Sequence, residues 1–228
     1  MRNPRSTRER SQVGLMTVAI MNMLRMSVGA ANPYQFGQWI ANSTSSQNWP
    51  DVVDSNKLYK YFRGDVSRHP IRLIGLLEEV FPGTKEKYWC GPDNLWVALW
   101  GDIQQISMLI KESARSPERS TLEAAIEGIF LENIAHDSVD LSTNIALYRY
   151  LNFTDPYGRF GDGLGFGRAF CAYGQIHESI LKDETKLHLS ELGILEGLIS
   201  EISLSEKQRT DLRPGWVSPL ECGASHAA

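Results

Sequence analysis

The sequence has few cysteines, and none of their spacings marks a metal site or a disulfide framework. Its three cysteines are Cys90, Cys171 and Cys222, which are too far apart in sequence to form a Cys-x-x-Cys pair. An odd number leaves at least one thiol without a disulfide partner, as is typical of reduced cytoplasmic proteins. We therefore expect a cytoplasmic protein that folds without disulfides and without bound zinc.

Long hydrophobic runs are also lacking. The most apolar stretch, residues 13–26, is interrupted by Asn22 and Arg25 and is shorter than the roughly 20 residues that cross a bilayer. Basic residues precede this stretch, as in a secretory signal, but Glu9 within them is atypical of one. We predict no membrane segment.

Recognisable catalytic and metal-binding motifs are missing as well. The glycine-rich segment Gly158–Gly167 lacks the Gly-x-Gly-x-x-Gly register, and no Lys-Ser or Lys-Thr pair follows it. The pair His136-Asp137, with Asp140 nearby, lacks further ligands at helical spacing. We predict no enzyme, no cofactor and no metal site.

Apolar residues recur every three to four positions through most of the chain, whereas the alternation that marks a strand is absent. This periodicity predicts an all-α, multi-helix globular protein. Glycine and proline punctuate the pattern, and Pro70 opens one of the helices. The helical runs that we predict cover residues 13–26, 33–40, 55–63, 71–81, 95–110, 122–130, 145–151 and 192–202.

Charge is distributed unevenly along the chain. Residues 1–72 contain ten Lys/Arg and four Asp/Glu, whereas residues 101–228 contain eleven Lys/Arg and nineteen Asp/Glu. Such asymmetry fits an N-terminal part that binds a polyanion and a C-terminal part that either keeps the chain in solution or binds a partner. We divide the chain into a basic flexible arm (1–12), a basic helical part (13–90) and an acidic helical domain (91–228).

One short segment carries the strongest functional signal. Basic residues recur at every third position and share one helix face, namely Lys57, Lys60 and Arg63. The opposite face is apolar, with Leu58, Tyr61 and Phe62. This division is typical of a helix that contacts nucleic acid, and Gly64 is a plausible stop for it.

The pattern Leu58-x-x-Tyr61-x-x-Gly64, followed by Pro70 and an amphipathic helix, resembles the second half of the helix-turn-helix unit in the lambda-repressor and Cro-like family. In that family an apolar residue and an aromatic residue anchor the recognition helix, a glycine ends it, and a proline opens the next helix. Upstream, Phe36-Gly37 resembles the family's apolar-then-small pair on the preceding helix.

The resemblance covers residues 33–81, although the connection between the two helices is longer here than the family's tight turn. It implies that Asn56 and Lys57 lie nearest the base edges. The residues that it places on phosphates are Lys60, Arg63 and Arg68. From the arm, Arg5 and Arg8 could reach along the phosphate backbone.

We therefore predict a DNA-binding regulatory protein whose basic helix, residues 57–63, meets double-stranded DNA. The alternative is a non-enzymatic protein–protein interaction module, an inhibitor or adaptor, that acts through the acidic residues 91–228. Self-association through the same residues is a further possibility. A small enzyme is the third hypothesis, and no spacing in the sequence assembles a site for it.

Overall fold

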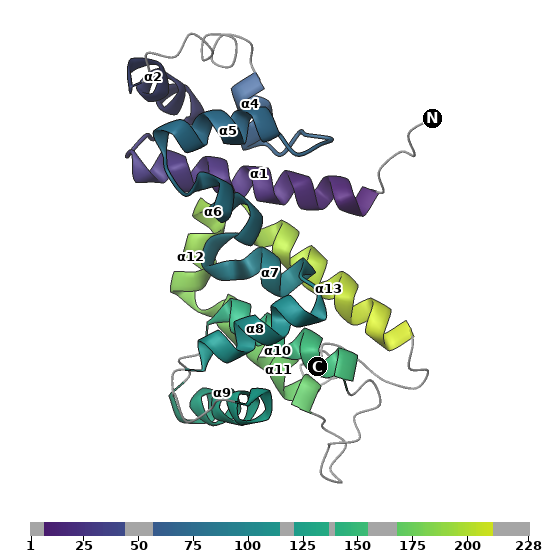
Figure 1. Cartoon of the computed structure of the whole chain (residues 1–228). Helices are drawn as coiled ribbons and strands as arrows, with labels where there is room; N and C mark the ends of the chain where they lie inside the picture. The colour runs from purple at the N-terminus through teal and green to yellow at the C-terminus, as the bar shows by residue number, and fades with distance from the viewer. Residues whose placement is uncertain (1–6, 44–56, 115–120, 137–139, 155–167, 212–228) are drawn as a thin grey trace, which may run out of the picture. The chain divides into compact units, whose positions relative to one another are not determined.

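Every regular element that the structure describes is a helix (Figure 1). The computed structural model describes residues 7–43, 57–114, 121–136, 140–154 and 168–211. No strand occurs in those ranges, so the all-α prediction is confirmed. Within the same ranges, no helix combines the length and the hydropathy that a membrane crossing requires.

Helix α1 (Thr7–Ser27) begins inside the stretch that the sequence predicts to be a flexible arm. Residues 7–12 lack glycine and proline, and Glu9 lies in the first turn, where the helix dipole favours a negative charge. The arm prediction therefore needs correction for residues 7–12, while residues 1–6 lie outside the described ranges. The apolar run that follows is buried, as predicted, through Val13, Met16, Ile20, Met21 and Leu24.

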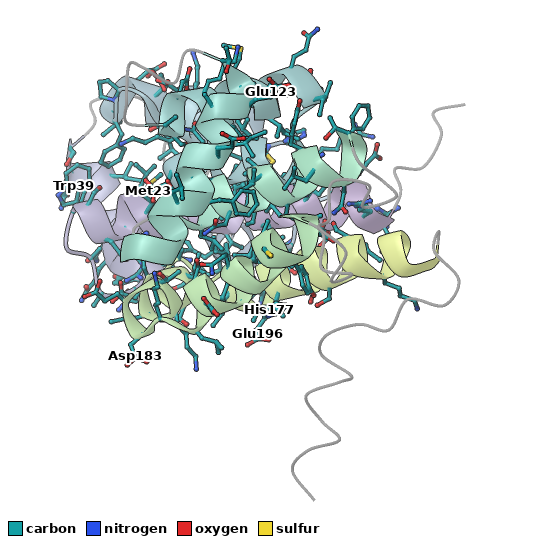
Figure 2. All side chains as sticks on the ribbon, turned by 90° about the horizontal axis from the view of Figure 1, so that it is seen from below. Met23, Trp39, Glu123, His177, Asp183 and Glu196 are labelled. Atoms are coloured by element: carbon teal, nitrogen blue, oxygen red, sulfur yellow. The ribbon has the colours of Figure 1, made fainter. Side chains whose placement is uncertain are left out.

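An aromatic cluster joins the helices that follow, which are α2 (Pro33–Ser43), α4 (Lys57–Phe62) and α5 (Ile71–Val80). The fully buried Phe36 meets Phe62 edge-on, with ring centroids 5.8 Å apart, and stacks with Phe81 at 6.3 Å. Trp39 also stacks with Phe81, with ring centroids 5.3 Å apart, and is at the outer edge of the view in Figure 2. The cluster thereby fixes α2 against α4.

The single helix predicted over residues 95–110 is in fact two helices. This region contains α6 (Thr84–Cys90), a 3-10 turn (Pro92–Asn94), α7 (Leu95–Trp100) and α8 (Ile103–Ser113). The side chain of Asp102 accepts the amides of Gln104 and Gln105, and the Gln105 side chain accepts the amide of Asp102, all at 2.9 Å. This capping box satisfies the open amides of a new helix start, which is why α7 and α8 separate at Gly101.

Helix α10 forms the centre of the second half. This part contains α9 (Leu122–His136), α10 (Leu141–Thr154), α11 (Arg168–Leu181) and α12 (Asp183–Glu191), of which α9 packs on α8 and α12 packs on α11. Residues 142–148 of α10 are all buried, because the helix packs against α7, α8 and α11. Its buried polar groups are paired, since the Thr143 hydroxyl lies 2.7 Å from that of Ser113 and the Asn144 amide donates to Ser179 at 3.3 Å.

Residues up to Leu195 form one compact unit, and a second unit begins at Glu196 with the rest of α13 (Leu195–Asp211). This division differs from the predicted one at residue 90. Close to that position Tyr88 is fully buried, and its hydroxyl lies 2.8 Å from Nδ1 of His69. Because α6 also packs against α1, α5 and α7, residue 90 belongs to the body of the first unit.

Candidate nucleic-acid interface

Helix α4, with Arg63 directly after it, turns its basic residues to solvent and its apolar residues to the protein. The exposed residues include Lys57, Lys60 and Arg63, as their spacing predicts. On the opposite side Leu58 is only 3% exposed, and Tyr61 and Phe62 are half-buried. The apolar side anchors the helix and leaves both lysine ammonium groups in solvent.

Gly64 ends this helix, as predicted. Its φ of 71° lies in the left-handed region, which suits a residue without a Cβ. The Gly64 amide donates to the Tyr61 carbonyl at 3.2 Å, and the Asp65 amide donates to the Lys60 carbonyl at 2.9 Å. This Schellman arrangement satisfies two carbonyls at the helix end and sets the direction in which the chain leaves α4.

The end of α4 lies directly against α1 because two glycines meet there. A Cβ added at Gly14 would lie 3.0 Å from the carbonyl oxygen of Gly64, and one added at Gly64 would lie 3.0 Å from Cγ2 of Val18. A side chain at either position would force the two backbones apart. Together with the contact between Phe36 and Phe62, this close approach holds α4 between α1 and α2.

The loop after α4 places a third basic residue, Arg68, beside the two lysines. Arg68 is exposed and borders a shallow pocket of about 270 Å³ together with Lys57 and Lys60. The acid beside this pocket is Asp65, whose carboxylate lies 3.0 Å from Nε of Arg63. In the part of the chain that the structure describes, neither lysine nor Arg68 has an ion-pair partner. An anion that approaches this pocket therefore meets three positive charges from two segments.

Arg8 lies in a different environment from the one predicted. It belongs to helix α1, where it is half-buried, and its positive charge acts on Arg149 of α10. The Arg149 guanidinium donates to the carbonyls of Ala98 at 2.8 Å and Gly101 at 3.0 Å. Burial, and secondly the positive charge of Arg8, lower the pKa of Arg149. Arg8 is thus part of a helix rather than of a flexible arm.

Two further exposed residues lie close in sequence to this surface and were not predicted as contacts. Tyr59 is 43% exposed, and at 100° per residue its position on α4 falls beside Arg63. Arg72 is exposed in the first turn of α5. A tyrosine between two lysines was the available signal, because its hydroxyl can donate to phosphate oxygens. The predicted contacts Asn56 and Arg5 lie outside the described residues.

Two other candidate features of the sequence are the His136-Asp137 pair and the glycine-rich segment. Among the described residues, no three His, Cys, Asp or Glu side chains come together as a metal site would require. The segment Gly158–Gly167 lies outside those residues. Comparison with known proteins finds no matching family model, no matching curated protein and no matching solved structure. The functional assignment therefore depends on the chain's own residues.

Proposed function

We propose that this chain is a regulatory protein that binds duplex DNA through its basic face, defined as Lys57, Lys60, Arg63 and Arg68. The observation that carries the proposal is that Arg68, which comes from the loop, borders the same pocket as the two lysines of α4. Charges from separate segments then act on one ligand surface. Duplex DNA offers such a surface, because it carries one negative charge per about 1.7 Å of its axis.

The local charge balance supports a polyanion as the ligand. Residues 57–72 contain five Lys/Arg and one acid, which is Asp65. The pair that Asp65 forms with Arg63 is open to solvent, with side chains 56% and 67% exposed. Such exposed pairs contribute only about 0–1 kcal/mol. Arg63 can therefore exchange this carboxylate for a phosphate at little cost.

The packing of α2 on α4 supports a helix-turn-helix mode of binding. Phe36 of α2 packs against Phe62 of α4, Gly37 beside it is buried, and Pro70 is the N-cap of α5. In this mode α4 enters the major groove and α2 braces it. Asn56 and Lys57 then lie nearest the base edges, while the rest of the basic face contacts phosphates.

The triple substitution Lys57→Ala, Lys60→Ala, Arg68→Ala tests this proposal. Each neutralised phosphate contributes about −0.9 to the slope of log affinity against log salt concentration. The four basic residues of the wild type should therefore give a slope of about −3.6, and the variant, which keeps only Arg63, a slope of about −0.9. Fluorescence anisotropy with a labelled duplex, measured at several NaCl concentrations, gives both slopes. Because the three side chains are exposed, the circular-dichroism spectrum and the melting temperature should not change.

A matched control removes the same charge elsewhere. Lys87, Lys111 and Lys186 are exposed on α6, α8 and α12, and their joint replacement by alanine should leave the salt slope at its wild-type value. Equal slopes for the two triple variants would show that binding follows net charge rather than the basic face. Wild-type protein without salt-dependent duplex binding would also contradict the proposal.

The alternative function, an inhibitor or adaptor that acts through residues 91–228, stays a prediction. The same assay separates it from DNA binding. If the wild-type chain shows no salt-dependent binding of duplex DNA, but as bait retains one stoichiometric protein partner from nuclease-treated lysate, the result would favour the alternative.

A further inference from the structure

A second pocket, of about 380 Å³, is bordered by residues of α1, α6, α7, α8 and the loop before α5. Three of the six tryptophans of the chain border it, namely Trp89, Trp96 and Trp100. Two glutamines, Gln12 and Gln105, add side-chain amides. The volume falls in the usual range for small-molecule sites, about 300–1,000 Å³, which combine aromatic walls with a few polar groups.

The aromatic walls are held in place by contacts within the protein. Trp96 and Trp100 stack with ring centroids 5.0 Å apart and planes 15° apart. His69 lies 4.8 Å from Trp89 between ring centroids, and its Nδ1 is 2.8 Å from the hydroxyl of the fully buried Tyr88. These contacts fix the rings before any ligand binds.

Trp89 is nevertheless 48% exposed beside these fixed rings. A large aromatic side chain that stays exposed at the edge of a pre-formed pocket offers its surface to a ligand. Because aromatic rings prefer offset stacking or edge-to-face contact with other rings, a flat ring system makes the best use of such walls.

The charges around the pocket favour an uncharged ligand. The carboxylate of Glu9 borders the pocket, but Glu9 already interacts with another group of the chain. The guanidinium of Arg149 donates to the carbonyl of Gly101, which also borders the pocket, and the charge of Arg8 acts on Arg149. Both signs of charge are thus present, and burying a charged ligand against indole rings is costly unless it gains a counter-charge of its own.

The amide of Gln12 supplies the polar contact that such a ligand needs. Gln12 is half-buried, and among the described residues its side-chain amide has no hydrogen-bond partner. The amide of Gln105, by contrast, gives its oxygen to the backbone amide of Asp102. A glutamine amide carries a donor beside an acceptor. It therefore pairs best with an acceptor beside a donor, as glutamine does on the edge of adenine.

We propose that this pocket binds an uncharged flat heterocycle whose edge carries a hydrogen-bond donor next to an acceptor, the class that includes lactams and nucleobases. The rings lie against the tryptophan walls, and the donor–acceptor edge pairs with the amide of Gln12. The site does not depend on the proposed DNA binding, because none of its bordering residues belongs to the basic face.

Four probes on one bicyclic ring system test the proposal. They are 2-quinolone, which has the donor–acceptor edge, N-methyl-2-quinolone, which lacks the donor, the cation N-methylquinolinium and the anion quinaldate. Isothermal titration and ligand-observed NMR on the full chain should show 2-quinolone binding about three- to ten-fold more tightly than N-methyl-2-quinolone, because one hydrogen bond is lost. Both charged probes should bind more weakly than 2-quinolone. Equal affinities for the two quinolones, an equal or higher affinity for either charged probe, or no binding of 2-quinolone would overturn the proposal.

Matched variants assign the binding to the pocket. Gln12→Leu should bring 2-quinolone down to the affinity of N-methyl-2-quinolone, whereas Gln38→Leu, at an exposed position of α2, should keep the difference. Trp89→Ala should weaken both quinolones, whereas Trp39→Ala, on the aromatic cluster of α2, should weaken neither. A preference for 2-quinolone that persists in Gln12→Leu, or equal effects of Trp89→Ala and Trp39→Ala, would refute the assignment.

Discussion

Replacing Gly64 by alanine is expected to destabilise the protein about three times as much as replacing Gly29. Both glycines have similar left-handed φ values, +71° and +68°, so a Cβ costs about 1 kcal/mol at either position. Around Gly29 no atom lies within 4 Å of that Cβ, whereas at Gly64 it would lie 3.0 Å from Val18 Cγ2 and 3.2 Å from the Gly14 carbonyl oxygen. Overpacking against backbone adds about 1–3 kcal/mol. We therefore expect losses of about 1 kcal/mol for Gly29→Ala and about 3 kcal/mol for Gly64→Ala.

Thermal unfolding followed by circular dichroism measures the difference. For a chain of this size each kcal/mol lowers the melting temperature by roughly 2–4 °C. Gly75→Ala is a control inside a helix, where a Cβ meets nothing within 4 Å, and it should stabilise the protein by about 0.5–1 kcal/mol. Equal melting temperatures for Gly64→Ala and Gly29→Ala would refute the close approach of α1 and α4.

Two further predictions concern helix starts. The Glu78 carboxylate accepts the amides of Lys85 at 2.6 Å and Gly83 at 3.0 Å, and these bonds lower its pKa. A pKa lowered by folding stabilises the protein above the ordinary glutamate range, and this contribution is lost as the pH falls through the lowered value. The difference in melting temperature between wild type and Glu78→Gln should therefore be present at pH 7 and shrink in acid, and a difference of constant size would contradict the role of the carboxylate. Asp102→Ala removes the capping box of α8 and should cost about 1 kcal/mol in urea unfolding, whereas Glu127→Ala on the exposed side of α9 should cost almost nothing; equal losses would argue against the cap.

Local signals predicted the fold well wherever a helix boundary depends on a single residue type. Gly64 and Pro70 mark the end of α4 and the start of α5, because one residue tolerates a positive φ and the other cannot continue a helix. The division between α7 and α8 was missed, since the apolar periodicity continues across it. The Asp-x-x-Gln pattern at Asp102 was the signal that could have shown it.

For the candidate site too, helical spacing predicts some features and not others. The exposure of Lys57, Lys60 and Arg63 follows from helical spacing alone. The convergence of Arg68 on the two lysines depends on the path of the loop after Gly64, which no periodicity encodes. The pocket bordered by Glu9, Trp89, Trp96 and Trp100 could not be predicted from the sequence, because it collects residues from 9 to 105 and only tertiary packing brings such distant positions together.

Arg68 and His69 are neighbours in the chain, yet each borders a different pocket. A rearrangement of the backbone at these two residues would therefore alter the lining of both pockets. Thermodynamic linkage would make any such coupling mutual, because the factor by which a ligand in one pocket alters the affinity of the other pocket is the same in both directions.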